Sequence, residues 1–286
     1  MNSDTNTGMS TTATNIESTH PTTLALRREG PVLHLSLNRP EVRNAMSLQM
    51  VQELHAVLAQ SEKLSEPPGG VRVIVLRGNG GHFCAGADLK DMAQARAKLA
   101  DDPQALAKTN AAFGELCVAF ARSPLVIVAV PEGSVMGGGL GLVCVADVAV
   151  AATSAVFRLP ETSLGLVPAQ IAPFLVERLG YAEAKRLAVT GGRLDAQQAL
   201  DLRLVHQVHA TGALDKAVEA LLAELLHCAP GAVASTKALM ARARFQPAAE
   251  LVQDAASAFS EAALGPEGSE GTLAFLQKRK AAWMLQ

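Results

Sequence analysis

The sequence is poor in aromatic residues and has almost no excess charge of either sign. It contains one Trp and one Tyr, and 25 Lys plus Arg nearly balance 27 Asp plus Glu to give a net charge of −2. Proteins that bind nucleic acid usually show a clear basic excess, so we expect no nucleic-acid partner. No apolar run approaches the ~18 residues that suggest a membrane span, so we also expect no membrane partner.

Paired cysteines, clustered metal ligands and a targeting leader are also missing. The four cysteines lie far apart and form no CxxC pair, which is typical of free thiols in a reducing compartment. The seven histidines show no HExxH spacing, so we predict no metal site. The first twenty residues contain no Lys or Arg, which a signal peptide or a mitochondrial presequence would need. We expect residues 1–22 to form a disordered tail and the protein to be cytoplasmic.

The chain has enough apolar material for the core of one large domain, because 49% of its residues are hydrophobic and 18% are charged. Alternating or β-branched runs at 32–37, 71–76, 125–130 and 148–152 predict strands. Apolar residues at helical spacing predict a helix over 47–64. Strands and helices that alternate in this way predict an α/β fold.

The pattern changes beyond about Pro168, where it becomes almost entirely helical. Helices are predicted at 195–202, 213–227 and 230–243.

Two turns rich in small residues each lie between a predicted strand and a predicted helix. Residues 83–90 are FCAGADLK, and residues 136–141 are MGGGLG. The start of a helix presents unpaired N–H groups and a partial positive charge, and small residues let a ligand atom approach the main chain. Two such turns facing each other predict an oxyanion hole, although tight packing would explain either turn alone. Neither turn matches a dinucleotide or phosphate-loop motif.

Five segments in order along the chain resemble the motifs of the crotonase (enoyl-CoA hydratase/isomerase) family. They are the NRPEVRNA segment at 38–45, FCAGADLK at 83–90, GGG at 137–139, FRLPETSLGLVP at 157–168 and AFLQKRK at 274–280. The resemblance implies a crotonase-like α/β spiral of ββα units over residues 23–210. It also implies a C-terminal helical trimerisation region over residues 211–286, and trimers or dimers of trimers. The substrate would be an acyl-CoA thioester, with no separate cofactor.

The resemblance also assigns the site. It implies that the backbone N–H groups of Ala87 and Gly138 bind the thioester oxygen, and that Phe275 and Lys278 reach the CoA of a neighbouring subunit. The residues expected to bind the CoA ester are Arg43, Ala85, Asp88, Leu89, Lys90, Phe275 and Lys278.

The family's two-carboxylate hydratases resemble this chain at only one of the two acidic positions. Gly141 stands where the first Glu would be, and Glu161 matches the second. A largely apolar neighbourhood would raise the pKa of Glu161 and suit it to act as both base and acid. A surface or helix-capping role is the simpler explanation of this residue alone. One hypothesis is that the substrate's own carboxylate enters the space left at Gly141.

A single acid fits two reactions. An isomerase needs one base to move a proton between carbons, and a hydratase can work with one if other groups hold the water. The LGLVPAQIAPF segment at 164–174 resembles hydratases of glutaconyl-type esters, 3-methylglutaconyl-CoA or isohexenylglutaconyl-CoA, in leucine or acyclic terpene breakdown. The resemblance therefore favours an enoyl-CoA hydratase. The alternatives are a Δ3,Δ2-enoyl-CoA isomerase that uses Glu161 and a catalytically silent binding protein.

Three polar residues near these motifs have simple structural explanations. Asp88 stands at a predicted helix start and is interpreted first as a cap. His82 is interpreted as a solvated loop residue. Arg158 could bind a substrate carboxylate, but a surface ion pair is the simpler interpretation.

Overall fold

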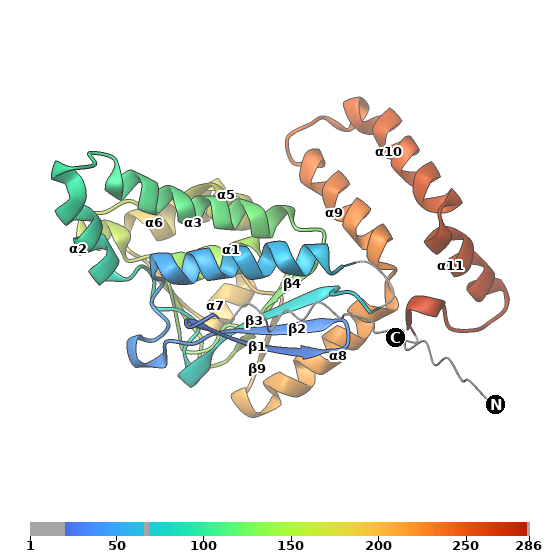
Figure 1. Ribbon diagram of the computed structural model, residues 1–286, viewed down its shortest axis with the longest axis horizontal. Helices are drawn as coiled ribbons and strands as arrows, with labels where there is room; N and C mark the ends of the chain where they lie inside the picture. Colours follow the sequence, from blue (N-terminus) through green and yellow to red (C-terminus); the bar gives the residue numbers. More distant parts are fainter. Residues whose placement is uncertain (1–20, 66–68, 285–286) are drawn as a thin grey trace, which may run out of the picture.

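The computed structural model describes residues 21–65 and 69–284, so residues 1–20 of the expected tail lie outside the described residues. In the described part, a six-stranded sheet has the order β1-β2-β3-β4-β6-β9, and a three-stranded sheet has the order β5-β7-β8 (Figure 1). The pairs β1–β2 and β7–β8 are antiparallel and the other pairs are parallel. The strands are β1 Leu24–Glu29, β2 Val32–Leu37, β3 Val73–Gly78, β4 Val126–Ala129, β5 Ser134–Met136, β6 Val148–Ala152, β7 Val156–Arg158, β8 Arg193–Asp195 and β9 Gln207–His209.

The α-helices cover both faces of the larger sheet and extend beyond it. They are α1 Leu48–Lys63, α2 Leu89–Ala97, α3 Ala105–Arg122, α4 Gly138–Val145, α5 Ala172–Leu179, α6 Tyr181–Val189, α7 Ala196–Asp201, α8 Leu214–His227, α9 Pro230–Ala243, α10 Ala248–Leu264 and α11 Pro266–Leu276. The predicted α/β alternation is confirmed. The helices expected at 47–64, 195–202, 213–227 and 230–243 are also confirmed, as α1, α7, α8 and α9.

The larger sheet buries both of its faces. Successive side chains of a strand point to opposite faces, so Ile74 of β3 packs in the cluster that includes α1 and α3, while Val75 packs in the cluster that includes α8. A strand that is buried on both faces reads as a continuous apolar run. This is why the sequence revealed β3, β4 and β6, whereas β2 was revealed by its alternation of apolar and polar residues. The four strands form the middle of the sheet.

The strands that the sequence did not reveal include the short β5 and β7, and they position the second glycine turn. Met136 at the end of β5 pairs in parallel with Arg158 at the end of β7. The N–H of Gly137 donates to the carbonyl of Arg158 at 3.1 Å. The chain segments that follow the two strands, one leading to Gly138 and the other to Glu161, therefore leave the small sheet side by side.

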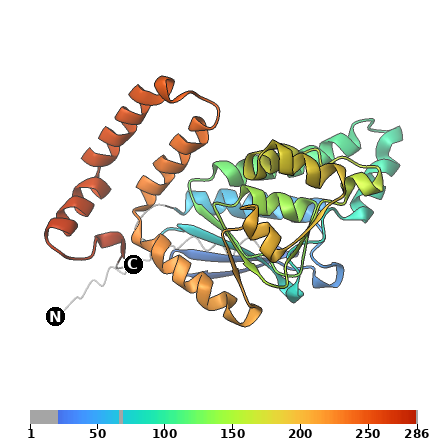
Figure 2. The same ribbon diagram turned by 180° about the vertical axis from the view of Figure 1, so that it is seen from behind.

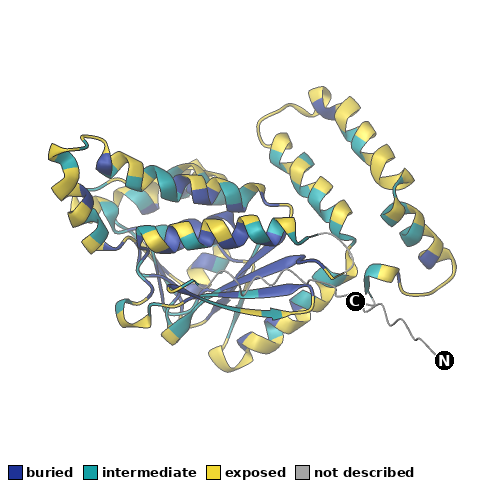
Figure 3. Cartoon of the chain, in the orientation of Figure 1, coloured by how far each residue is buried: buried dark blue, intermediate teal, exposed yellow. Residues whose placement is uncertain are grey.

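The C-terminal helices form an arm that stands away from the sheets, whereas α8 packs on the sheet through Leu214 and Val218. Figures 1 and 2 show α9, α10 and α11 at one end of the molecule and α2 at the other, and Figure 3 shows that the arm is mostly exposed. We expected the C-terminal helical region to begin at residue 211. The first helix of that region, α8, packs with the core. No single helix in the described ranges is long and apolar enough to cross a membrane.

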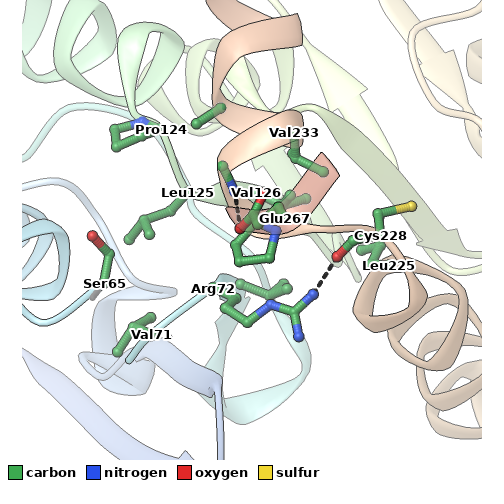
Figure 4. Close-up of a pocket in the computed structure, with 14 residues that line it drawn as sticks. Ser65, Val71, Arg72, Pro124, Leu125, Val126, Leu225, Cys228, Val233 and Glu267 are labelled. Carbon is green, nitrogen blue, oxygen red and sulfur yellow. Dashed lines mark hydrogen bonds between the residues drawn. The ribbon is translucent and has the colours of Figure 1, made fainter. Parts of the chain in front are cut away.

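A cavity of about 240 Å³ marks the place where the arm leaves the core (Figure 4). The guanidinium group of Arg72 donates to the carbonyl of Cys228 and, at 2.9 Å, to that of Trp283. The carboxylate of Glu267 accepts the N–H groups of Gly231 at 2.9 Å and Ala232 at 3.0 Å, at the start of α9. The Arg72 bonds attach the segments on either side of the arm to the core, and the Glu267 bonds join α11 to α9 within the arm.

Candidate active site

A cavity of about 350 Å³ brings together the three residues for which the sequence predicts catalytic roles. Ala87, Gly138 and Glu161 all line it. A larger hollow of about 1050 Å³ lies between α3, α5 and α9, but neither glycine turn lines it. The smaller cavity is therefore the candidate active site.

The first glycine turn is bonded to the strand that precedes the second. The N–H of Cys84 donates to the carbonyl of Ser134 at 2.9 Å, and the N–H of Met136 donates back to the carbonyl of Cys84 at 2.9 Å. Gly86 has a φ of +93°, which a side chain would strain, and a Cβ there would lie 3.3 Å from the carbonyl oxygen of Met136. The two turns consequently lie against each other.

Both turns leave a backbone N–H group without an acceptor among the described residues. Gly138 is the first residue of α4, so its N–H has no partner within the helix. Ala87 pairs with Met46 through its flanking groups: the N–H of Met46 donates to Gly86 at 2.7 Å and the N–H of Asp88 donates to Met46 at 3.0 Å. Two unpaired N–H groups at one cavity can stabilise one developing oxyanion.

Glu161 places a carboxylate with one unpaired oxygen beside the second turn. It is the first residue of a short 3-10 helix, Glu161–Leu164, and its Oε2 atom is buried with no hydrogen-bond partner among the described residues. Burial raises the pKa of Glu161, and a backbone hydrogen bond opposes that shift. A Cβ on Gly137, where φ is +48°, would lie 2.6 Å from Oε1 of Glu161. The glycine turn thus makes room for the acid.

Gly141 does not leave an open space. A Cβ at this buried position would overlap Cγ2 of Ile171 and lie 3.3 Å from Cζ of Phe113. The hypothesis that a substrate carboxylate enters the space left at Gly141 is therefore wrong, because the side chain of Ile171 fills it.

Comparison with known proteins identifies the fold and the family. The family model described as "Enoyl-CoA hydratase/isomerase" matches residues 27–286. The chain belongs to this family. It is 31% identical to the putative enoyl-CoA hydratase/isomerase YngF of Bacillus subtilis, over 87% of this chain and 93% of that protein. It is 30% identical to the trans-2-decenoyl-[acyl-carrier-protein] isomerase of Streptococcus mutans, over 73% of this chain and 76% of that protein.

Solved structures of the family superpose over nearly the whole chain. Pseudomonas aeruginosa AtuE has a TM-score of 0.87 and 52% identity, covering 92% of this chain and 99% of that one. An enoyl-CoA hydratase/isomerase from Marinobacter aquaeolei has a TM-score of 0.86 and 48% identity over the same shares. The predicted crotonase fold with a C-terminal helical region is confirmed, and the protein is an enzyme of the enoyl-CoA hydratase/isomerase family.

Asp88 caps a helix in this crotonase structure, as the sequence predicts. Its Oδ1 atom accepts the N–H of Lys90 at 2.9 Å, and its Oδ2 atom pairs with Arg39 at 2.8 Å. Burial tends to raise the pKa of Asp88, but the hydrogen bonds from Arg39 and Lys90 hold it below its ordinary value. Both carboxylate oxygens are therefore occupied.

The remaining predicted CoA-binding residues lie outside the cavity. Arg43, Leu89 and Lys90 are exposed near the first turn, and the carbonyl of Arg43 accepts the N–H of Ala85 at 2.9 Å. The C-terminal residues predicted to bind CoA, Phe275 and Lys278, belong to the arm at the far end of the molecule from α2 (Figure 1). That they reach a neighbour's site stays a prediction.

The other polar residues considered from the sequence also lie outside the cavity. His82 accepts the N–H of Ser134 at 3.1 Å through Nδ1, which gives it a structural part in joining the first turn to β5. Arg158 is exposed on β7.

Four polar residues of the cavity were missed: Arg96 on α2, Thr109 and Asn110 on α3, and Gln170 before α5. The Nε2 group of Gln170 donates to Oδ1 of Asn110 at 2.8 Å. A Cβ on Gly114 would overlap Oε1 of Gln170. Gly114, in the middle of α3, was the one local signal in the sequence that could have pointed to Gln170. A glycine destabilises a helix, so its presence there suggests that another side chain packs closely against it.

Proposed function

We propose that the protein is an enoyl-CoA hydratase that adds water across the α,β double bond of a branched glutaconyl-type CoA thioester. The observation that carries the proposal is the unpaired Oε2 atom of Glu161 on the same cavity as the free N–H groups of Ala87 and Gly138. Its raised pKa suits a group that accepts and returns a proton.

The reaction follows from this arrangement. The N–H groups of Ala87 and Gly138 hold the thioester oxygen and stabilise the charge that develops on it. The water oxygen bonds to the β carbon while the Glu161 carboxylate takes the proton of the water. The protonated Glu161 then gives a proton to the α carbon, so one water is added and the carboxylate is regenerated.

The acyl group is proposed to be that of 3-methylglutaconyl-CoA or isohexenylglutaconyl-CoA, intermediates of leucine or acyclic terpene breakdown. Residues 166–171, within the segment that resembles hydratases of these esters, form one wall of the cavity. Arg96 supplies a cation on a lining that is otherwise mostly apolar, and a guanidinium group suits a second carboxylate on the substrate. No cofactor is needed beyond the CoA of the substrate.

We also propose a trimer or a dimer of trimers in the cytoplasm. Support for assembly comes from the large apolar side chains exposed on the arm, where Phe245 is 78%, Phe259 76% and Phe275 84% exposed. Exposed apolar surface of this extent is typical of an interface. Buried free thiols at Cys84, Cys117 and Cys144 suit a reducing compartment.

A spectroscopic assay tests the reaction. Hydration is measured with crotonyl-CoA, 3-methylglutaconyl-CoA and isohexenylglutaconyl-CoA, and isomerisation with a 3-enoyl-CoA. We expect hydration with preference for a glutaconyl-type ester, and a loss of about 100-fold or more in kcat for Glu161→Gln. Isomerisation without hydration would instead identify a Δ3,Δ2-enoyl-CoA isomerase, the reaction that a single acid also fits.

A further inference from the structure

A hydratase with one carboxylate needs another group to hold its water, and the cavity offers a pair of amides for this task. Gln170 and Asn110 both line the cavity with Glu161, and they come from different elements, the turn before α5 and the middle of α3. A hydrogen bond of 2.8 Å from Nε2 of Gln170 to Oδ1 of Asn110 joins the two amides. Each amide group keeps further donor capacity after this bond.

The packing shows that the place of the Gln170 amide is built into the fold. Its Oε1 atom occupies space that a side chain on Gly114 would fill, and Gly114 lies buried within α3. A glycine inside a helix costs up to about 1 kcal/mol relative to alanine. The glycine that accommodates the amide of Gln170 therefore makes α3 less stable than an alanine would.

The neighbouring residue explains why an amide serves here. Ile171 fills the space that the Cβ atom of any side chain at residue 141 would occupy, so a second acid has no room there unless Ile171 moves. Gln170, the residue before it, is the polar group that the same turn brings to the cavity.

We propose that Gln170 binds the attacking water at the β carbon and that Asn110 is a positioning residue that orients the Gln170 amide. The proposal rests on the hydratase function proposed above. In the addition step, Gln170 holds the water oxygen, which bonds to the β carbon, while the water proton passes to Glu161 and then to the α carbon. Gln170 itself gains and loses no proton.

Two variants and a control test this role. Gln170→Leu removes the amide, and Gly114→Ala displaces it indirectly while favouring the helix. Gln197→Leu is the matched control, because Gln197 makes a similar 2.8 Å hydrogen bond, to Asp201, on the exposed face of α7. Each variant is assayed for hydration and for exchange of the α protons of butyryl-CoA in D₂O. The exchange needs Glu161 and the oxyanion hole but no bound water nucleophile.

We expect hydration to fall on the order of 100-fold in Gln170→Leu, the cost of a misplaced reactant, with proton exchange within about twofold of the parent. Gly114→Ala should lose hydration in the same way without a lower Tm. Unchanged hydration in folded Gln170→Leu would overturn the proposal, and so would a parallel loss of exchange, which would mean that Glu161 had been disturbed. A parent enzyme that exchanges protons and isomerises but does not hydrate would instead refute the proposed function on which the inference rests.

Discussion

At the scale of single residues, the partly buried carboxylate of Glu161 suits proton transfer but lowers the stability of the fold at neutral pH. Burial raises its pKa above the ordinary value in the folded protein. A group of this kind stabilises the fold fully below its unfolded-state pKa and loses that contribution as the pH rises through the folded-state pKa. A reactive group held this way is destabilising at neutral pH.

The first prediction follows from the direction of this pH dependence of stability. Glu161→Gln, which carries no charge, should have a higher Tm than the parent at about pH 8 and nearly the same Tm at about pH 4. Thermal unfolding at the two pH values measures the difference. A Tm gain at the acidic pH alone would mean that the pKa is lowered instead of raised.

Gly138 is the second residue whose role a substitution can isolate. A bulky side chain in Gly138→Val should obstruct the approach to its N–H and cost about 2.7–4 kcal/mol of transition-state stabilisation, the range for one lost oxyanion donor. The new Cβ would lie 3.3 Å from Cζ of Phe113, so some movement of that ring is expected as well. The control is Gly212→Val, where a Cβ meets nothing within 4 Å. Steady-state kcat/KM is the readout, and equal values in the two variants would contradict the oxyanion role.

Arg96 should discriminate between substrates. Because a guanidinium group recognises a carboxylate on the acyl chain, Arg96→Leu should raise KM for a glutaconyl-type ester on the order of tenfold, a loss of about 1.4 kcal/mol. KM for crotonyl-CoA, which has no such carboxylate, should stay the same. Arg158→Leu, an exposed position outside the cavity, is the matched control. A similar rise for both esters would point to general damage of the pocket.

At the scale of elements, the contact between α4 and the start of α5 determines which acids the site can hold. Gly141 lies in buried α4, and Ile171 stands at the N-cap of α5. Since even one added methyl group would overlap Ile171, a larger residue at position 141 forces Ile171 to move.

The corresponding prediction concerns stability. Gly141→Ala should lower the free energy of unfolding by roughly 1–3 kcal/mol, the usual cost of overpacking a core. Ile171→Ala removes the overlapping Cγ2 atom, so the double variant should lose less than the sum of the two single losses. Urea unfolding of the four proteins completes the cycle. Additive losses would show that the two positions do not touch.

At the scale of the whole molecule, the separation of the arm from the cavity bears on assembly. Phe275 belongs to α11 and Lys278 follows this helix, which lies at the opposite end of the molecule from α2 (Figure 1). The side chain of Phe275 is 84% exposed. If Phe275 and Lys278 serve a site, it must belong to another copy of the chain. The notion of a shared site can be tested by mixing subunits.

The last prediction uses complementation. Phe275→Ala should raise KM for CoA esters severalfold without changing the fold, and Glu161→Gln should be nearly inactive. Oligomers reassembled from both variants should regain activity above the sum of the separate proteins, because some sites combine an intact Glu161 with an intact Phe275 from the neighbour. Sedimentation checks the assembly. If the activity of the mixed oligomers only equals the sum of the two separate variants, Phe275 contributes to the site of its own chain or to no site.

The sequence by itself determined the features that depend on local pattern. Apolar and alternating runs predicted the central strands, and the predicted capping residue Asp88 stands at the N-cap of α2. The motif order predicted the family, and the three catalytic candidates line one cavity. The short strands β5, β7, β8 and β9 were missed because three residues give too little periodicity to recognise.

The tertiary structure alone decided what lies across from each residue. The sequence showed a missing acid at Gly141 but could not show that Ile171 fills its place, because the two positions meet only when α4 and α5 pack. It could not pair Gln170 with Asn110, which are 60 residues apart in the chain. Side-chain chemistry and helix propensity are local properties and can be read from sequence, whereas the space around a side chain depends on packed elements that are distant in the chain.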